Sequence, residues 1–190
     1  MALFEEATPA DAQDYSASYG GGQQQAAYEQ QDETRLQREA PTTTREVVSD
    51  PTNERPGTIT VDTAGRYLYL SMPNGQAMRY GIGVGREGFT WKGRVNIGRK
   101  ETWPNWTPPK EMLKRRPDLP RHMAGGEENP LGARAMYLYS GGKDTMFRIH
   151  GSNEPWTIGQ AVSSGCIRMT NEDVTDLFSR VKVGASVVVL

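Results

Sequence analysis

The chain contains a single cysteine, Cys166, and its neighbours favour a nucleophile. A free cysteine most often packs as a small buried apolar residue. Here Ser163, Ser164 and Gly165 come directly before it, which suits a tight turn better than a core strand. Gly165 lets the backbone bend, so that amides near Gly165 and Cys166 can converge on an oxyanion. This turn is the first candidate for chemistry.

His150 is the natural base for that thiol. It ends a predicted strand and is followed by Gly151. A histidine at a strand end is often only a packed core residue, but a cysteine nucleophile needs a neighbouring base, and histidine is the usual one. The other histidine, His122, lies in a charged, proline-rich segment and has the character of a solvated or lid residue. We therefore assign the base to His150.

The composition argues against several other kinds of site and partner. One cysteine excludes an internal disulfide framework and a multi-cysteine metal site, and two histidines mean that any metal site would have to be built from carboxylates. Lys plus Arg is 22 and Asp plus Glu is 23, and this balance argues against a nucleic-acid partner. No run approaches the ~20 apolar residues that span a membrane.

The near-neutral total hides two segments of opposite charge. Residues 1–55 carry 4 bases and 11 acids, a net charge of 4 − 11 = −7, whereas residues 56–190 carry 18 bases and 12 acids, a net charge of 18 − 12 = +6. The first segment is rich in Gln, Ser and Gly, without sustained apolar periodicity. We interpret 1–55 as a disordered acidic tail or linker, with a helix near 23–40 as an alternative, and 56–190 as the domain.

The N-terminus does not have the pattern of a secretory signal. It lacks a basic start and an apolar run, and acids occur at Glu5 and Glu6. Two alternatives stay open: the protein is cytoplasmic, or the numbering begins after a signal.

Residues 56–190 have the pattern of short strands joined by turns. Asp62–Gly65 is a good hairpin turn, and Pro73-Asn74-Gly75 contains the Asn-Gly pair of another tight turn. A proline- and charge-rich excursion over 101–132 is typical of a lid or binding loop. The predicted strands span 58–61, 67–70, 76–84, 133–139, 145–150 and 186–190.

One helix is marked near the C-terminus. Thr170 begins an [S/T]-x-x-[D/E] opening that ends at Asp173, in which its hydroxyl can cap a free amide. Apolar residues then recur at positions 174, 177, 178 and 181, the i, i+3, i+4, i+7 pattern of one buried helical face. Gly184 ends the helix. These elements predict a mainly β domain with one C-terminal helix.

Three stretches together resemble the L,D-transpeptidase catalytic domain family (YkuD, or ErfK/YbiS-like). They are His150–Asn153, Ile158–Val162 and Ser163–Met169, with a His-to-Cys interval of 166 − 150 = 16. Asn129-Pro130-Leu131-Gly132, followed by a strand, is similar to a further element of that family. The similarity covers about 56–190. It implies a β-sandwich or barrel-like domain.

The resemblance also implies an activity. Peptidoglycan stem peptides would be the substrate, and the Cys166 thiolate would attack the L-centre carbonyl of a diaminoacyl third residue, releasing the terminal D-alanine. An amine on another stem or on an envelope protein would then take the thioester. A backbone carbonyl, that of Gly151 or Ser152, would hold the other ring nitrogen of His150. The resemblance implies neither a metal nor an organic cofactor. It also implies a monomer that acts in the periplasm or cell envelope, in cell-wall biogenesis and in cell shape.

Several alternatives stay open within the resemblance. Arg168 either orients a substrate carboxylate or braces its loop, and Ser163 and Ser164 are further candidate substrate contacts. Ser164 stands where many members have histidine, which leaves open any proton-transfer role of that position. The acceptor is another stem, an envelope protein or water, and water would make the enzyme a carboxypeptidase or endopeptidase.

Two rivals lie outside the resemblance. A sortase has a much wider His-to-Cys interval than 16 and a different sequence around its cysteine. A non-catalytic cell-wall-binding module gives no reason for a base next to a thiol.

Overall fold

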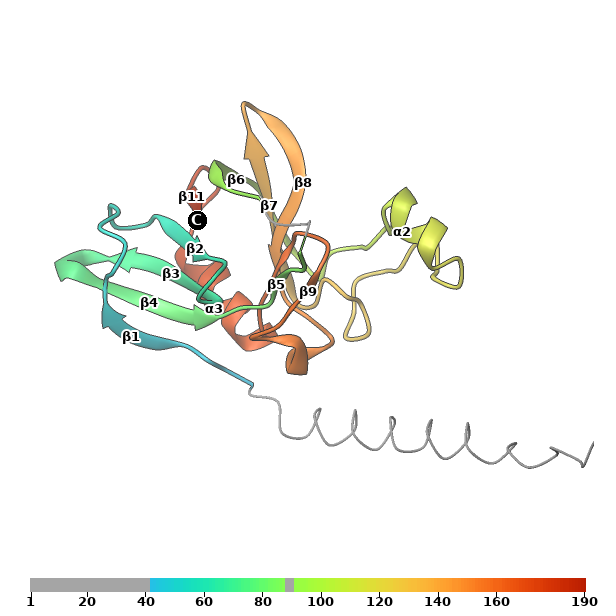
Figure 1. Cartoon of the computed structure of the whole chain (residues 1–190), viewed down its shortest axis with the longest axis horizontal. Coiled ribbons are helices and arrows are strands. Elements are labelled where there is room, and N and C mark those ends of the chain that lie inside the picture. The colour runs from blue at the N-terminus through green and yellow to red at the C-terminus, as the bar shows by residue number, and fades with distance from the viewer. Residues whose placement is uncertain (1–41, 88–90) are drawn as a thin grey trace, which may run out of the picture. The chain divides into compact units, whose positions relative to one another are not determined.

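A computed structural model of the chain describes residues 42–87 and 91–190 (Figure 1). The expected disorder or helix over the first 41 residues lies outside the described residues. Within them the fold is mainly β, as predicted. The strands are β1 (Glu46–Ser49), β2 (Ile59–Asp62), β3 (Tyr67–Met72), β4 (Gln76–Gly81), β5 (Val84–Gly85), β6 (Gly93–Thr102), β7 (Arg134–Ser140), β8 (Lys143–His150), β9 (Ala161–Ser163), β10 (Ile167–Arg168) and β11 (Ser186–Val189).

Helices α2 (Lys110–Arg115) and α3 (Asn171–Arg180) accompany the strands, with 3-10 turns η1 (Pro73–Gly75) and η2 (Pro155–Thr157). The predicted C-terminal helix is α3, and the backbone N–H of Asp173 donates to the Thr170 hydroxyl at 3.1 Å, as the capping pattern requires. The sequence did not predict α2, because this one-and-a-half-turn helix follows two prolines inside the excursion. None of the described helices has the length and apolar character needed to cross a membrane.

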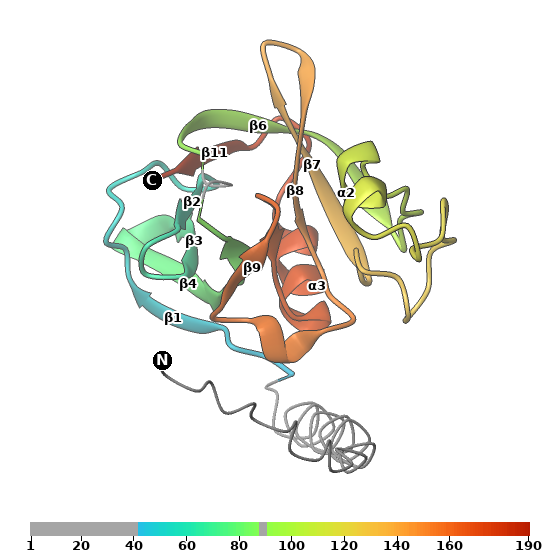
Figure 2. The same ribbon diagram turned by 45° about the vertical axis from the view of Figure 1, so that its right-hand side comes forward.

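Among the described residues, nine strands form one curved sheet, and β5 and β9 form a separate pair. The order in the sheet is β1-β4-β3-β2-β11-β6-β7-β8-β10. Strands β2 and β11 pair in parallel, as do β8 and β10, while the other neighbours in the sheet are antiparallel. Figure 2 shows the sheet curling, so that β1–β4 and β6–β8 lie around the core with α3 beside β7 and β8.

The core is a single apolar cluster beneath this curl. Both expected hairpins contribute to it: β2 pairs with β3, and β3 pairs with β4. Asn74 and Gly75 have φ values of +64° and +68°, the left-handed geometry that the Asn-Gly pair predicts. Its fully buried members include Ile59, Leu68, Tyr80, Ile97, Met136, Leu138, Ile149, Leu177 and Val187.

The expectation that residues up to 55 are a disordered tail is wrong for 42–55. Strand β1 pairs with β4 over four residues. Just before it, Thr43 Oγ1 donates to Asp173 Oδ1 at 2.6 Å, and Thr44 donates to Asp173 Oδ2 through both its backbone N–H and its hydroxyl at 2.8 Å. Asp173 is fully buried. Polar contacts, and not apolar burial, hold this segment, so a composition argument missed it.

These contacts predict that the two threonines stabilise the domain. The double substitution Thr43→Val and Thr44→Val should lower the free energy of unfolding by about 2 kcal/mol, because hydrogen bonds to a buried carboxylate are lost while side-chain shape is kept. Urea denaturation measures this loss.

Thr60→Val is the matched control for that pair. Thr60 is 2% exposed, and its hydroxyl has no hydrogen-bond partner among the described residues. The same exchange there should leave stability unchanged or raise it. Equal losses in both proteins would contradict the assigned role of Asp173.

Candidate active site

The site is built on the parallel pairing of β8 and β10. The register places Ile149 opposite Ile167 and His150 opposite Arg168. Both isoleucines are buried in the core cluster. Since side chains alternate across a strand, His150 and Arg168 lie on the opposite face of the sheet from the isoleucines.

The same alternation places the thiol. Cys166 comes one residue before β10, so its position in the register is beside Arg148, two residues before His150. Cys166 and His150 are thus diagonal neighbours on one face of the sheet. The register therefore places the two residues of the sequence hypothesis on one face of the sheet, one strand apart.

The tautomer of His150 follows from its one ring hydrogen bond. Its Nδ1 lies 2.5 Å from the carbonyl oxygen of Gly151. A carbonyl oxygen only accepts, so Nδ1 carries the proton and Nε2 keeps a free lone pair. The ring is 4% exposed, and burial, assisted by the Arg168 charge, lowers the pKa of His150 to about 4. At neutral pH the imidazole is uncharged and able to accept a proton.

The pKa of the Cys166 thiol is shifted in the opposite direction. Burial raises the pKa of Cys166 above its usual value, opposed by a hydrogen bond from the backbone N–H of Arg148 and by the charges of Arg148 and Arg168. Neutral thiol and neutral imidazole are therefore the resting pair. These pKa directions favour a base that removes the thiol proton during attack over one that holds a preformed thiolate.

The turn before Cys166 is fixed by Ser163. Its hydroxyl donates to the Cys166 carbonyl oxygen at 2.6 Å and accepts the Gly165 N–H at 3.1 Å. Gly165 has a φ of +107°, where side chains are rarely tolerated. The Gly165 amide is thus used inside the turn, whereas the Cys166 N–H has no acceptor among the described residues. Of the two amides expected to face an oxyanion, only that of Cys166 is available.

Position 151 requires glycine because the atoms around it are closely packed. A Cβ there would collide with the side-chain oxygen of Asn171 and contact the Ala133 amide at 3.1 Å. That Asn171 oxygen accepts the Ala133 N–H at 2.8 Å. Gly151 therefore keeps the carbonyl that holds His150 close to the start of α3.

Arg168 braces a loop. Its guanidinium donates to Glu154 Oε2 at 2.8 Å and lies 3.4 Å from Thr157 Oγ1. Its backbone N–H and carbonyl exchange hydrogen bonds of 2.9 Å with Gly83. These contacts connect β10 to the segment 154–157 and support the bracing alternative for Arg168.

Sequence reasoning missed Arg148. Its guanidinium makes two hydrogen bonds to the Asp144 carboxylate, of 2.7 and 2.9 Å, and lies over the ring of Tyr137 at 4.4 Å. Arg99 lies over the same ring at 3.6 Å. The alternation of the predicted strand 145–150 was a usable signal, because it places Arg148 on the face of His150.

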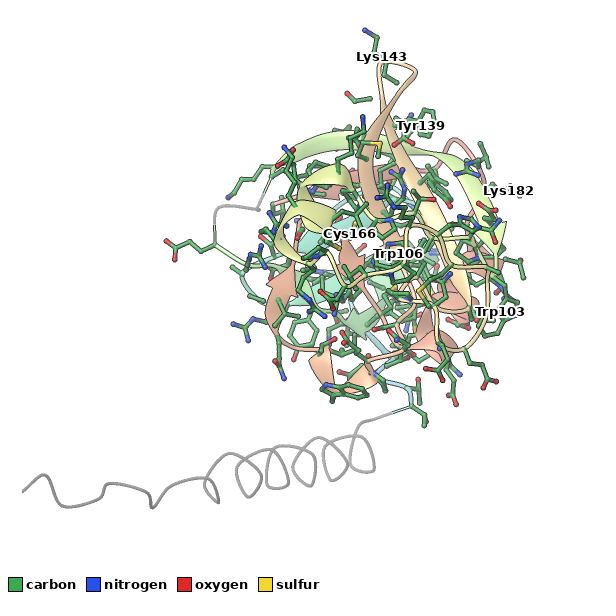
Figure 3. The ribbon with its side chains drawn as sticks, turned by 90° about the vertical axis from the view of Figure 1, so that its right-hand side faces the viewer. Trp103, Trp106, Tyr139, Lys143, Cys166 and Lys182 are labelled. Carbon is green, nitrogen blue, oxygen red and sulfur yellow. The ribbon has the colours of Figure 1, made fainter. Side chains whose placement is uncertain are left out.

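The excursion between β6 and β7 is ordered around Asn129. Its side-chain amide donates to the carbonyls of Pro104 and Ala124 at 3.0 and 2.9 Å, and its oxygen accepts the Leu131 N–H at 2.9 Å. His122 is exposed on this excursion. Figure 3 is viewed from the excursion's side, with Cys166, Trp103 and Trp106 labelled. A lid role for the excursion stays a prediction.

A cavity of about 490 Å³ is lined by none of the residues of the turn 163–166. Two arginines and one glutamate line it, but Arg79 pairs with Glu46, and Arg66 donates to the Gly159 carbonyl at 2.5 Å. The residues that line the cavity are Thr44, Glu46, Gly65, Arg66, Tyr67, Arg79, Gly81, Ile158 and Gly159.

No cluster of three or more potential metal-binding His, Cys, Asp or Glu side chains occurs in the part of the chain that the structure describes.

Comparison with known proteins decides the family. The family model of the YkuD L,D-transpeptidase catalytic domain matches residues 56–189. The chain belongs to this family. It is 35% identical over 141 residues to the Escherichia coli K12 protein named "Probable L,D-transpeptidase ErfK/SrfK", a match that covers 70% of this chain. The chain spans 43% of that relative's length, less than half.

Solved structures agree on the fold of this family. A Brucella melitensis protein, described as a probable carnitine operon oxidoreductase, is 46% identical with a TM-score of 0.54, covering 83% of this chain and 99% of its own. L,D-transpeptidase 3 from Mycobacterium tuberculosis, at 17% identity and a TM-score of 0.52, covers 70% of this chain and 59% of its own. The predicted resemblance is thereby confirmed.

The pKa directions predict how Cys166 responds to pH. Its alkylation by iodoacetamide should stay slow at pH 7 and rise with a midpoint above the ~8.5 of an ordinary thiol, because burial favours the neutral form. The same chain unfolded in urea is the control, since its single thiol should titrate near ~8.5. A plateau already reached below pH 7 would show a preformed thiolate–imidazolium pair and contradict this picture.

The turn geometry predicts different tolerance at adjacent positions. Ser164→Ala should keep acylation of the enzyme within about tenfold, or about 1.4 kcal/mol, because the half-buried Ser164 side chain makes no hydrogen bond among the described residues. Gly165→Ala should slow acylation far more, because φ is +107° there. Mass-spectrometric acylation rates of the two variants provide the measurement, and equal effects would overturn this account of the turn.

Proposed function

We propose that this chain is a peptidoglycan L,D-transpeptidase with Cys166 as nucleophile and His150 as base. The observation that carries the proposal is the His150 ring, whose Nδ1–H is held by the Gly151 carbonyl so that Nε2 is free on the same face as the thiol. A merely structural histidine in a binding module has no need of that arrangement. Membership of the L,D-transpeptidase family supports the same reading.

The reaction begins with proton transfer. His150 Nε2 takes the Cys166 proton as Sγ bonds to the L-centre carbonyl carbon of the diaminoacyl third residue, and the Cys166 N–H stabilises the oxyanion. The amide bond then breaks, the proton on His150 passes to the departing amine of D-alanine, and a thioester remains. Because the imidazole has a pKa of about 4, it returns readily to the neutral form after each transfer.

An acceptor amine completes the cycle. The neutral His150 removes a proton as the amine attacks the thioester, and that proton returns to the departing Cys166 sulfur. An amine on another stem or on an envelope protein yields a new amide bond, and water in its place yields hydrolysis. We propose transfer as the main outcome, with carboxypeptidase or endopeptidase activity as the alternative at the same site. This substrate class implies action in the periplasm or cell envelope, in cell-wall biogenesis and in cell shape, by a monomer.

The remaining site residues have positioning roles in this proposal. Ser163 holds the turn, Gly165 permits its backbone, and Gly151 supplies the carbonyl for His150. Arg168 braces the segment that follows His150 through Glu154, and so acts on substrate geometry through that loop. Ser164 is left as the side chain of the turn that is free to meet substrate.

A covalent probe tests the nucleophile and base together. The solved M. tuberculosis neighbour carries a faropenem-derived adduct, so a carbapenem or faropenem is a suitable mimic of the donor stem. The wild-type chain should gain one acyl group, on Cys166, by intact-mass and peptide mass spectrometry. Cys166→Ser should abolish the adduct, and His150→Gln should slow it at least about a hundredfold.

Two controls keep this test sharp. The double variant should be no worse than Cys166→Ser alone, because the two residues act as one unit, and His122→Gln should acylate at the wild-type rate. Normal acylation of His150→Gln near pH 7 would overturn the base, and an adduct at another residue would overturn the nucleophile. Incubation with a defined tetrapeptide stem, with and without an amine acceptor, then separates transfer from hydrolysis.

A further inference from the structure

The peptide group between Gly165 and Cys166 is anchored from its carbonyl side by a residue that no sequence motif marks. The indole Nε1–H of Trp91 donates to the Gly165 carbonyl oxygen at 3.3 Å. That carbonyl and the Cys166 N–H belong to the same peptide unit. The described residues contain no cis peptide bond, so the two groups point in opposite directions. A contact that fixes the carbonyl therefore also fixes the direction of the Cys166 N–H.

The Trp91 ring is itself held in place. It stacks on Phe147 with ring centroids 4.8 Å apart and an angle of 15° between the planes. Both rings pack against the core cluster. Phe147 is adjacent in β8 to Arg148, which lies opposite Cys166 when the register of β8 and β10 is continued by one residue. One aromatic pair thus connects the strand beside the thiol to the carbonyl that precedes it.

Trp91 holds a peptide of this turn that the Ser163 hydroxyl does not bind. The Ser163 hydroxyl binds the Gly165 N–H and the Cys166 carbonyl, the groups on either side of the Gly165–Cys166 peptide. Gly165 itself resists rotation poorly, because it lacks a side chain. Without the indole contact, that peptide has no hydrogen bond to the described residues on its carbonyl oxygen.

We infer that Trp91 is a positioning residue that aims the Cys166 N–H at the oxyanion formed when Sγ attacks a carbonyl. The inference rests on the proposed function. When the Sγ–C bond forms, the carbonyl π electrons move to oxygen, the thiol proton goes to His150 Nε2, and the negative oxygen meets the Cys166 N–H. An oxyanion donor acts only when its direction is set in advance.

The test compares two reactions of the same thiol. Acylation by a carbapenem passes through an oxyanion, whereas alkylation by iodoacetamide displaces iodide at a saturated carbon and forms none. Trp91→Phe keeps an aromatic ring next to Phe147 but removes the N–H donor. It should lower the maximal acylation rate at least tenfold, with little change in the concentration giving half that rate, and leave alkylation within about twofold.

A second variant and a control separate positioning from general destabilisation. Benzothienylalanine, placed at position 91 alone, replaces the indole N–H by sulfur and keeps nearly the same shape. It should therefore lose acylation to the same extent as Trp91→Phe. This variant keeps the test decisive even if the smaller phenylalanine ring impairs folding. Tyr80→Phe also removes one aromatic hydrogen bond, from Tyr80 to Asp176 at 2.6 Å. It should lower the melting temperature while leaving the ratio of acylation to alkylation at the wild-type value.

The outcomes distinguish this inference from the function on which it rests. A wild-type chain that no carbapenem acylates at Cys166 would overturn the proposed function, and this inference with it. Normal acylation of wild type with an unchanged ratio in both position-91 variants would overturn the role of Trp91 alone. An equal fall in acylation and alkylation would also overturn it, because Trp91 would then support the thiol and not the oxyanion donor.

Discussion

The parallel pairing of β10 with β8 is the constraint on which the candidate site depends. β10 has only two residues, yet it is bonded on one side to β8 and on the other to Gly83. A Cβ at Gly83 would lie 2.9 Å from the Thr157 carbonyl oxygen, so this contact requires glycine. Because the ladder fixes the register, it places the thiol beside Arg148 and on the face of His150. Backbone hydrogen bonds thus set the placement of Cys166 relative to His150.

Burial shifts the pKa values of Cys166 and His150 in opposite directions. It favours the uncharged form of each group, so it lowers the pKa of His150 to about 4 and raises the pKa of Cys166. The guanidinium charges of Arg148 and Arg168 favour the thiolate and disfavour the imidazolium. The resting site holds a protonated thiol, which is a poorer nucleophile but is also less open to oxidation than a thiolate. In the proposed reaction, charge separation is then confined to the moment of attack.

A buried carboxylate ties the N-terminal strand to the domain. Asp173 lies in the first turn of α3 with no solvent exposure, and the hydroxyls of Thr43 and Thr44 satisfy it. Removal of a donor from a buried carboxylate costs far more than a surface contact would. Strand β1 therefore belongs to the sheet although its own residues are mostly exposed. The family match begins only at residue 56, after this strand.

The sequence by itself determined the elements with local signals: the Asn74-Gly75 turn, the Thr170 cap, the hairpins and the turn that precedes Cys166. Each depends on neighbouring residues, whose preferences are visible in one short window. Only the tertiary structure decided what depends on distant partners. Asp173 binds Thr43 and Thr44, which lie 130 and 129 positions earlier in the sequence. Trp91 contacts Gly165, 74 positions later, and the Arg168 guanidinium pairs with Glu154. No local pattern encodes such contacts, because sheet register and loop closure bring their members together.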